Sequence, residues 1–182
     1  MIIIIAGKIK SGKDTVAKLI SKEMDEINKK TVIIQFSSYI KMYAKNILNW
    51  NGLEETKPRK FLQDLGQDIR NNISNKFFIN RIIDDIKVYS DYMDMIIISD
   101  ARLPEEIDCI KEKYPNAISI KVERKDFNQN ITLTEKNHIT EHALDNYNYF
   151  DYIIENDGSL NDLNTKVIKI LNNIKEKEWK KI

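Results

Sequence analysis

A short segment near the start of the chain has the residue types and the spacing of a phosphate-binding loop. Its glycines and lysine fit the pattern G-x-x-x-x-G-K, between an apolar run and a segment of helical period. Glycines let successive backbone N–H groups converge on phosphate oxygens, and the following helix adds its positive dipole end. Lys13 would supply a point charge to the β and γ phosphates. The nucleotide-binding residues predicted from this segment are Gly7, Lys8, Lys10, Ser11, Gly12, Lys13, Asp14 and Thr15.

The residue after Lys13 departs from the usual pattern. Asp14 stands where a serine or threonine hydroxyl usually binds magnesium. Thr15 lies about 100° further around a helix, so its hydroxyl cannot simply replace the missing one. Two interpretations stay open: Asp14 approaches magnesium, directly or through water, or it stabilises the first helical turn. In either case a carboxylate beside the phosphates predicts strongly magnesium-dependent binding.

A second group of candidates follows the third apolar run, Met95 to Ser99. Asp100 ends this run, where a carboxylate can hold magnesium through water at the carboxyl edge of a sheet; the alternative is a helix-capping role. Arg102 follows at the same edge and offers a planar donor for phosphate. Arginine is scarce, since the chain has 24 lysines and only 5 arginines. Four of them occur at predicted phosphate-facing edges, namely Arg59, Arg70, Arg102 and Arg124.

The composition is that of an ordinary globular domain. The 29 basic and 28 acidic residues leave a net charge of +1, which argues against a nucleic-acid coat or an anionic-membrane patch. No apolar run reaches the roughly 18 residues of a spanning helix. One cysteine and two histidines exclude an internal disulfide and disfavour a zinc site. We expect a single cytoplasmic domain over residues 1–182, with no nucleic-acid or membrane partner; a homodimer is compatible with the sequence.

Apolar runs and helical periods alternate along the chain. The pattern predicts an α/β fold, with a five-stranded parallel sheet covered by helices on both faces. The fourth strand alternates apolar and polar residues and is expected to be the more exposed one, whereas the fifth is expected to be buried. Ser37 and Ser38 offer an N-cap to the helix that follows the second strand. The five predicted strands are 2–6, 31–36, 95–99, 117–122 and 150–154.

Five segments, in order along the chain, resemble those of the deoxynucleoside monophosphate kinases of bacteriophages and their bacterial relatives. The phosphate-binding loop has the form GKxxSGKDT, and a second segment has the form L-Q-x-L-G. A strand-end D-x-R-x-P-x-E, an H-x-S-E-x-x-L-D with threonine in place of serine, and an F-D-x-x-I-x-N-D-G complete the set. More distantly, the loop is similar to that of animal-type phosphomevalonate kinases. The last four segments are 62–66, 100–106, 138–145 and 150–158.

This resemblance implies an ATP- and magnesium-dependent kinase of the P-loop type that acts on small nucleotide substrates. It implies an acceptor-binding insertion over about residues 37–92 and a lid over about residues 124–145. The catalytic residues would be Lys13, Arg102, Arg124 and Asp100, with magnesium near Asp14 and Asp100. The adenine ring would lie near Asn156, Asp157 and Gly158. The acceptor would be held by Lys41, Arg59, Arg70, His138 and Glu141.

Two other functions stay open at this point. One is a kinase of another small phosphorylated acceptor, such as phosphomevalonate. The segments L-Q-x-L-G and D-x-R-x-P argue against this function and favour a nucleotide acceptor. The other is a P-loop switch protein that binds and slowly hydrolyses a nucleotide. Against the switch, the chain has no N-K-x-D guanine-reading segment after a strand, and it has insertions that a switch does not need.

Overall fold

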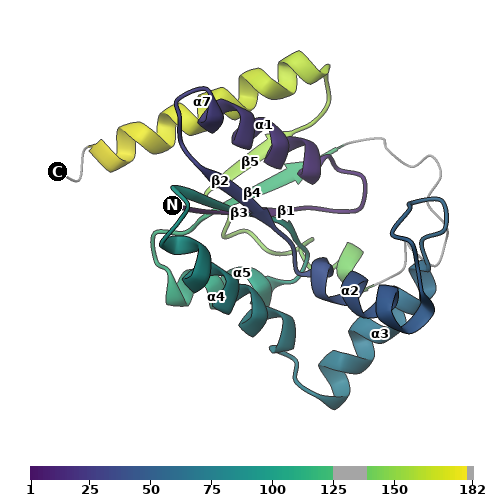
Figure 1. Ribbon diagram of the computed structural model, residues 1–182. Helices are drawn as coiled ribbons and strands as arrows, with labels where there is room; N and C mark the ends of the chain where they lie inside the picture. The colour runs from purple at the N-terminus through teal and green to yellow at the C-terminus, as the bar shows by residue number, and fades with distance from the viewer. Residues whose placement is uncertain (125–138, 180–182) are drawn as a thin grey trace.

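The sheet of this protein has five parallel strands in the order β2-β3-β1-β4-β5, which confirms the predicted fold class. The computed structural model describes residues 1–124 and 139–179 (Figure 1). The central strand β1 pairs with β3 on one side and with β4 on the other. The phosphate-binding loop therefore leaves the middle of the sheet. The strands are β1 (Ile2–Ala6), β2 (Thr31–Ile34), β3 (Met95–Ala101), β4 (Ile118–Glu123) and β5 (Tyr152–Glu155).

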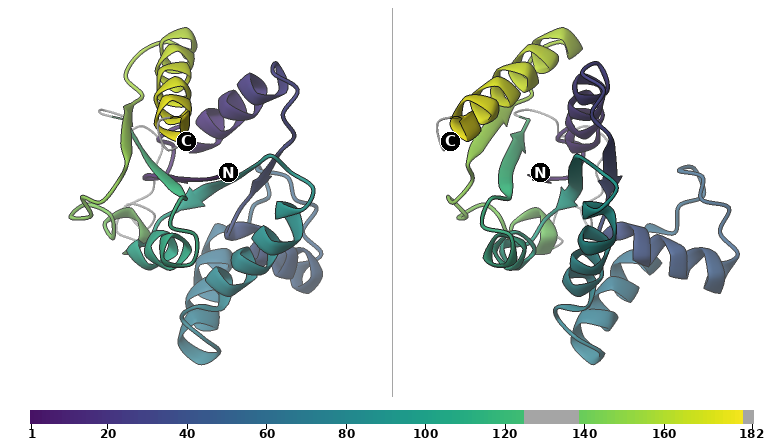
Figure 2. Two further views of the ribbon diagram at one scale, coloured as in Figure 1. Left: turned by 90° about the vertical axis from the view of Figure 1, so that its left-hand side faces the viewer. Right: turned by 60° about the vertical axis from the view of Figure 1, so that its left-hand side comes forward.

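The helices divide between the two faces of the sheet and one projecting pair. In Figures 1 and 2, α1 and α7 cover one face, and α4 and α5 lie across the other, while α2 and α3 project beyond the carboxyl edge. In the part of the chain that the structure describes, no helix is long and apolar enough to cross a membrane. The helices are α1 (Lys13–Asp25), α2 (Ser37–Leu48), α3 (Arg59–Asn72), α4 (Phe77–Ser90), α5 (Pro104–Lys113) and α7 (Leu160–Trp179), with a 3-10 turn at Ile139–Glu141.

Strand β1 shows why the apolar runs are continuous. Ile3 and Ile5 pack into the cluster under α1 and α7, whereas Ile4 and Ala6 pack into the cluster with α4 and α5. Neighbouring side chains of a strand point to opposite faces, so a strand buried on both faces needs apolar residues at every position. The two clusters together fix the end of β1, and hence the start of the phosphate-binding loop.

The prediction that the fourth strand is more exposed than the fifth was wrong. Strand β4 lies inside the sheet, and its polar residue Ser119 is fully buried. Asp151 makes the burial of Ser119 possible, because its carboxylate accepts hydrogen bonds from the backbone N–H and the hydroxyl of Ser119 at 2.7 and 2.9 Å. Strand β5 lies at one edge of the sheet instead, and its Ile153 is 58% exposed.

Helix α2 begins at Ser37, without a side-chain cap from its own serines. The carboxylate of Asp100 accepts hydrogen bonds from the backbone N–H groups of Phe36 and Ser37 at 2.8 and 3.0 Å. A group from the end of β3 therefore satisfies N–H groups that a helix start leaves without intrahelical partners. This contact ties the first turn of α2 to the carboxyl edge of the sheet.

Candidate active site

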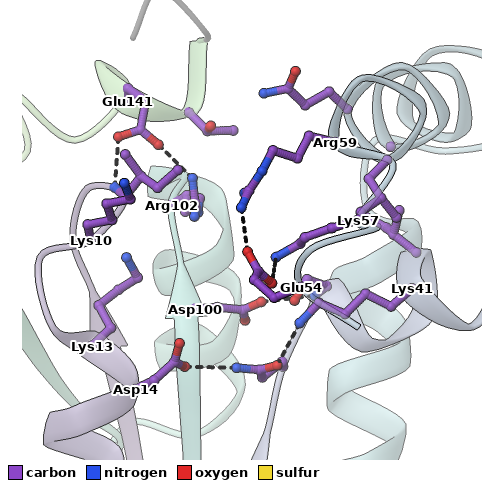
Figure 3. Close-up of a pocket in the computed structure, with 18 of the residues that line it drawn as sticks. Lys10, Lys13, Asp14, Lys41, Glu54, Lys57, Arg59, Asp100, Arg102 and Glu141 are labelled. Atoms are coloured by element: carbon purple, nitrogen blue, oxygen red, sulfur yellow. Dashed lines mark hydrogen bonds and ion pairs between the residues drawn. The ribbon is translucent and has the colours of Figure 1, made fainter. Parts of the chain in front are cut away.

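A cleft of about 780 Å³ lies at the carboxyl edge of the sheet, between the phosphate-binding loop and the projecting helices α2 and α3 (Figure 3). Its position fits the rule that parallel α/β sheets bind ligands beyond the carboxyl ends of their strands. Most of the predicted site residues come together there. Those that line the cleft are Lys10, Gly12, Lys13, Asp14, Thr15, Lys41, Arg59, Arg70, Asp100, Arg102, Arg124 and Glu141.

The two glycines of the loop adopt positive φ angles, +149° at Gly7 and +103° at Gly12. A Cβ atom at Gly7 would clash with the carbonyl oxygen of Val122, and one at Gly12 would clash with the side-chain amide of Asn156. Both positions therefore need glycine for their backbone conformation, and at Gly7 the Val122 backbone also leaves no space for a side chain. The loop gains its tight curvature from this close approach to β4 and to the segment after β5.

The residues predicted around the adenine ring lie outside the lining of this cleft in the described part of the chain. Asn156 supports the loop instead, since its side-chain amide donates to the Ser11 carbonyl at 2.9 Å. Asp157 accepts a hydrogen bond from Lys166 at 2.6 Å. Lys8 forms an ion pair with Asp145 at 2.6 Å. The contact of Asn156, Asp157 and Gly158 with a base stays a prediction.

Lys13 is held as a buried cation, with 7% of its surface exposed. Its ammonium group donates to the carbonyl oxygen of Lys8 at 2.6 Å. Burial, followed by the positive charge of Arg102, lowers the pKa of Lys13 to about 8, although Glu141 and two aspartates act in the opposite direction. At neutral pH this lysine is therefore charged but poorly compensated, and an anionic ligand beside it would be favoured.

Glu141 joins three parts of the site. Its buried carboxylate accepts hydrogen bonds from the loop N–H of Ile9 at 2.8 Å and from the guanidinium of Arg102 at 2.6 Å. The 3-10 turn that carries Glu141 is thus linked to the loop and to the end of β3 (Figure 3). This contact orients Arg102 toward the loop. The direct role of Glu141 in acceptor binding stays a prediction.

Glu106 is a buried carboxylate that the sequence reasoning did not place in the site. It accepts hydrogen bonds from the backbone N–H groups of Arg102 and Leu103 at 2.7 and 3.1 Å, and its other oxygen lies 3.6 Å from the guanidinium of Arg70. Burial raises the pKa of Glu106 to about 7. Arg70 also lies over the ring of Phe78, 5.1 Å from its centroid. Glu106 therefore connects helix α3 to the turn that carries Arg102.

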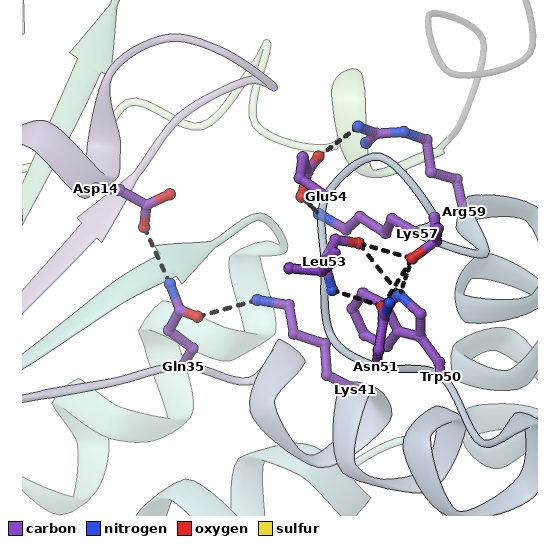
Figure 4. A network of polar contacts seen from close by, with 10 residues as sticks. Asp14, Gln35, Lys41, Trp50, Asn51, Leu53, Glu54, Lys57 and Arg59 are labelled. Carbon is purple, nitrogen blue, oxygen red and sulfur yellow. Dashed lines mark hydrogen bonds and ion pairs between the residues drawn. The ribbon is translucent and has the colours of Figure 1, made fainter.

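A chain of polar contacts crosses the floor of the cleft (Figure 4). The amide of Gln35 donates to Asp14 and to the Ser99 hydroxyl, each at 2.9 Å, and its oxygen accepts from Lys41 at 3.1 Å. Burial lowers the pKa of Lys41. Gln35 was missed by the sequence reasoning, although its place directly after β2 puts it at the same sheet edge as Asp100. It couples the phosphate-binding loop to the first turns of α2.

The loop between α2 and α3 adds two further charged residues to the cleft, Glu54 and Lys57. The carboxylate of Glu54 contacts the ammonium of Lys57 at 3.0 Å and the guanidinium of Arg59 (Figures 3 and 4). This stretch falls within the acceptor-binding insertion predicted over about residues 37–92, but neither Glu54 nor Lys57 was among the predicted site residues. Its charged residues gave no signal of their own, because Glu and Lys are common throughout the chain.

Part of the predicted lid lies outside the described residues. His138 and residues 125–137 belong to this stretch. The residues on its two sides, Arg124 and Thr140, both line the cleft. The lid assignment and the role of His138 stay predictions.

A model of the deoxynucleotide monophosphate kinase family matches residues 27–167. The chain belongs to this family. It is therefore a P-loop phosphotransferase, as the resemblance implied. The phosphate-binding loop precedes the matched residues and has the geometry described above. A search among curated proteins found no match.

Solved structures of several kinases share the fold. A shikimate kinase from Aquifex aeolicus is 13% identical, with a TM-score of 0.53 over 95% of this chain and 97% of that chain. A thymidylate kinase from Ehrlichia chaffeensis is 17% identical, with a TM-score of 0.50 over 94% and 98%. An APS kinase from Mycobacterium tuberculosis, in complex with AMPPNP and APS, is 12% identical, with a TM-score of 0.51 over 94% and 96%. These likenesses confirm the P-loop kinase fold.

Proposed function

We propose that the protein transfers the γ-phosphoryl group of ATP to a deoxynucleoside monophosphate and releases the diphosphate. The observation that carries this proposal is a single cleft with cations at both ends. Lys13 and the loop lie at one end, and Lys41, Arg59 and Arg70 lie at the other. A triphosphate donor requires the first set and a phosphorylated acceptor requires the second. Membership of the deoxynucleotide monophosphate kinase family supports the choice of acceptor.

The donor end offers three kinds of group to a triphosphate. The loop supplies backbone N–H groups and the positive end of the α1 dipole. Lys13 supplies a buried charge whose lowered pKa would rise again beside phosphate. The buried Ser11 hydroxyl has no hydrogen-bond partner among the described residues. A phosphate in the loop would compensate the Lys13 charge, which among the described residues is held by the Lys8 carbonyl oxygen.

The carboxylates of the cleft fit a magnesium ion. Magnesium prefers oxygen ligands and keeps several waters when it binds with nucleotide phosphates. Asp14 is exposed, and its partners among the described residues, Gln35 and Ser99, both contact Oδ1, so it would hold the ion directly or through water. Both oxygens of Asp100 accept backbone N–H groups, so it would act through water. Bound magnesium would neutralise phosphate charge.

The transfer itself needs positioning and charge neutralisation, and no protein base. The acceptor phosphate oxygen is already a nucleophile, and the charge of the transferring group is spread over its oxygens. Arg102 and Arg124 line the cleft and carry planar donors suited to that charge. Glu141 holds the Arg102 guanidinium at 2.6 Å, so Arg102 is oriented before any substrate arrives. We assign both arginines to the phosphoryl group in transit.

The acceptor end combines cations with an apolar wall. Ile40 and Leu62 line the cleft next to Gln63 and the cations of α2 and α3. Gly66 leaves room there, since a Cβ atom would lie 3.1 Å from the Ile40 side chain. An apolar surface beside an amide suits a nucleobase, whereas the cations suit its monophosphate. We therefore place the nucleoside against α2 and α3 and its phosphate toward Arg102.

An ATP-consumption screen tests this proposal directly. Each ribo- and deoxyribonucleoside monophosphate, and phosphomevalonate, is offered with ATP and magnesium, and product diphosphate is identified by chromatography. We expect turnover with one or more deoxynucleoside monophosphates and none with the Lys13→Ala variant. Turnover of phosphomevalonate alone would move the assignment to another phosphorylated acceptor. ATP hydrolysis that no acceptor stimulates would instead indicate a switch protein.

A further inference from the structure

At the acceptor end of the cleft, two cations hold a carboxylate of the protein itself. The ammonium of Lys57 lies 3.0 Å from Glu54, and the guanidinium of Arg59 contacts its other oxygen. All three side chains line the cleft, and the Glu54 side chain is 63% exposed. The hydrogen bond from Lys57 lowers the pKa of Glu54, so this group is an anion at neutral pH.

The backbone around Glu54 is held by contacts that do not involve its side chain (Figure 4). The indole N–H of Trp50 donates to the Leu53 carbonyl at 3.1 Å and to the Thr56 hydroxyl at 3.2 Å. The Asn51 side chain accepts from the Leu53 N–H at 3.0 Å and from the Thr56 hydroxyl at 2.8 Å. Since the Glu54 side chain is absent from this network, it can leave its partners without unfolding the loop.

A point charge and a planar guanidinium that grip one anion form the usual geometry of a phosphate site. Here a carboxylate takes that place. The site faces the phosphate-binding loop across the same cleft, with Arg102 between them (Figure 3). The position is therefore the one that the acceptor phosphate needs under the proposed function.

We propose that Glu54 occupies the binding position of the acceptor's phosphate and is displaced from Lys57 and Arg59 when that phosphate binds. The residue then sets the affinity and the selectivity of the acceptor end. This inference rests on the proposed function for the identity of the acceptor, but the ion pairs that carry it are independent of that identity.

Charge decides which ligands displace Glu54. A phosphate monoester carries nearly two negative charges at neutral pH and has three terminal oxygens, whereas the carboxylate carries one charge and two oxygens. A dianionic phosphate therefore replaces the carboxylate with a net gain, and a monoanion does not. Glu54 thus favours phosphorylated acceptors over carboxylates of similar size.

The test compares Glu54→Gln with Glu55→Gln, which makes the same charge change at the next residue. Glu55 is exposed and is not among the described residues that line the cleft. For Glu54→Gln we expect the KM of the acceptor to fall by about threefold to tenfold, the range for loss of one or two exposed ion pairs. The KM for ATP, which depends on the donor end of the cleft, should stay unchanged. Glu54→Asp, which keeps the charge, should remain nearer the wild type.

A second measurement separates this inference from the proposed function. Calorimetric titration with inorganic phosphate, at constant ADP, reports the anion affinity of the wild type, Glu54→Gln and Glu55→Gln without turnover. Tighter phosphate binding by Glu54→Gln alone supports the displacement even if no nucleoside monophosphate is phosphorylated. Equal affinities in the three proteins, or a higher acceptor KM in Glu54→Gln, would overturn it, because Glu54 would then only position Lys57 and Arg59.

Discussion

Replacing Lys13 by methionine should stabilise the ligand-free protein while it abolishes phosphoryl transfer. Only 7% of Lys13 is exposed, and the one hydrogen-bond acceptor of its ammonium group among the described residues is the Lys8 carbonyl. Folding therefore takes a charge out of water without an adequate partner. Methionine has a similar shape and carries no charge, so it removes this cost.

The magnitude follows from the pKa of Lys13, which falls from 10.5 to about 8 on folding. At about 1.4 kcal/mol for each pKa unit, the charged form costs about 3 kcal/mol of folding free energy below pH 8. The methionine variant also loses the hydrogen bond to Lys8, which destabilises it by about 1 kcal/mol. We expect the free energy of unfolding of Lys13→Met to exceed that of the wild type by about 2 kcal/mol at pH 7.

The pH dependence gives the sharper signature. Between about pH 8 and 10.5 the unfolded wild type binds more protons at Lys13 than the folded form, so its stability should rise with pH. The methionine variant lacks this rise, and its advantage should vanish toward pH 10.5. Urea unfolding at pH 7 and pH 10 measures the difference, with Lys18→Met, an exposed lysine of α1, as control.

Two results would refute this reasoning. A Lys13→Met protein less stable than the wild type at pH 7 would show that the lysine is well compensated in the folded state. An advantage of equal size at both pH values would show that packing, and not charge, causes it. Phosphoryl transfer within a few-fold of the wild type would separately remove Lys13 from the donor site.

Three further variants probe other parts of the site. Asp14→Ser should remain active with a relaxed magnesium requirement, because it restores a hydroxyl and removes a charge; activity as low as that of Lys13→Ala would make the carboxylate an essential ligand. Burial raises the pKa of Glu106 to about 7, so its contribution to stability falls as pH rises from 4.5 to 7. In Glu106→Gln this loss of stability, about 3 kcal/mol between pH 4.5 and 7 in urea unfolding, should be absent. The same pH dependence in the variant and the wild type would contradict a raised pKa of Glu106. Arg124→Lys should lower kcat strongly with little change in the KM for ATP, as expected for a contact made mainly in the transition state; a selective rise in KM would place Arg124 in ground-state binding.

The parts of this protein that were predictable from sequence are those set by neighbouring residues. The phosphate-binding loop follows a strand and precedes a helix within a few positions, so its glycines and Lys13 could be assigned before the fold was known. The apolar runs likewise indicated the five strands, although the edge strands β2 and β5 are only partly buried. Such local patterns led to the correct fold class and to the loop residues of the cleft, whereas the family resemblance supplied the candidates at its other end.

What escaped prediction depends on contacts between distant segments. Ser119 is polar, and only the approach of Asp151 allows β4 to lie inside the sheet. The α2 start uses a carboxylate from β3 in place of its own serines. Gln35 and Glu54 have no motif, and their positions in the cleft follow from strand order and loop path. A single sequence carries no signal for such pairings.

The order of the strands also has a consequence during synthesis on the ribosome. Strand β1 is translated before both of its neighbours, since Ile2 pairs with Ile96 of β3 and Ile3 pairs with Ile118 of β4. Until that later part of the chain emerges, the isoleucines of β1 have no sheet to join. Pairings between segments this far apart form slowly, and unpaired apolar strands are prone to aggregate. The nascent chain therefore has to be protected longest at the strand that later carries the phosphate-binding loop.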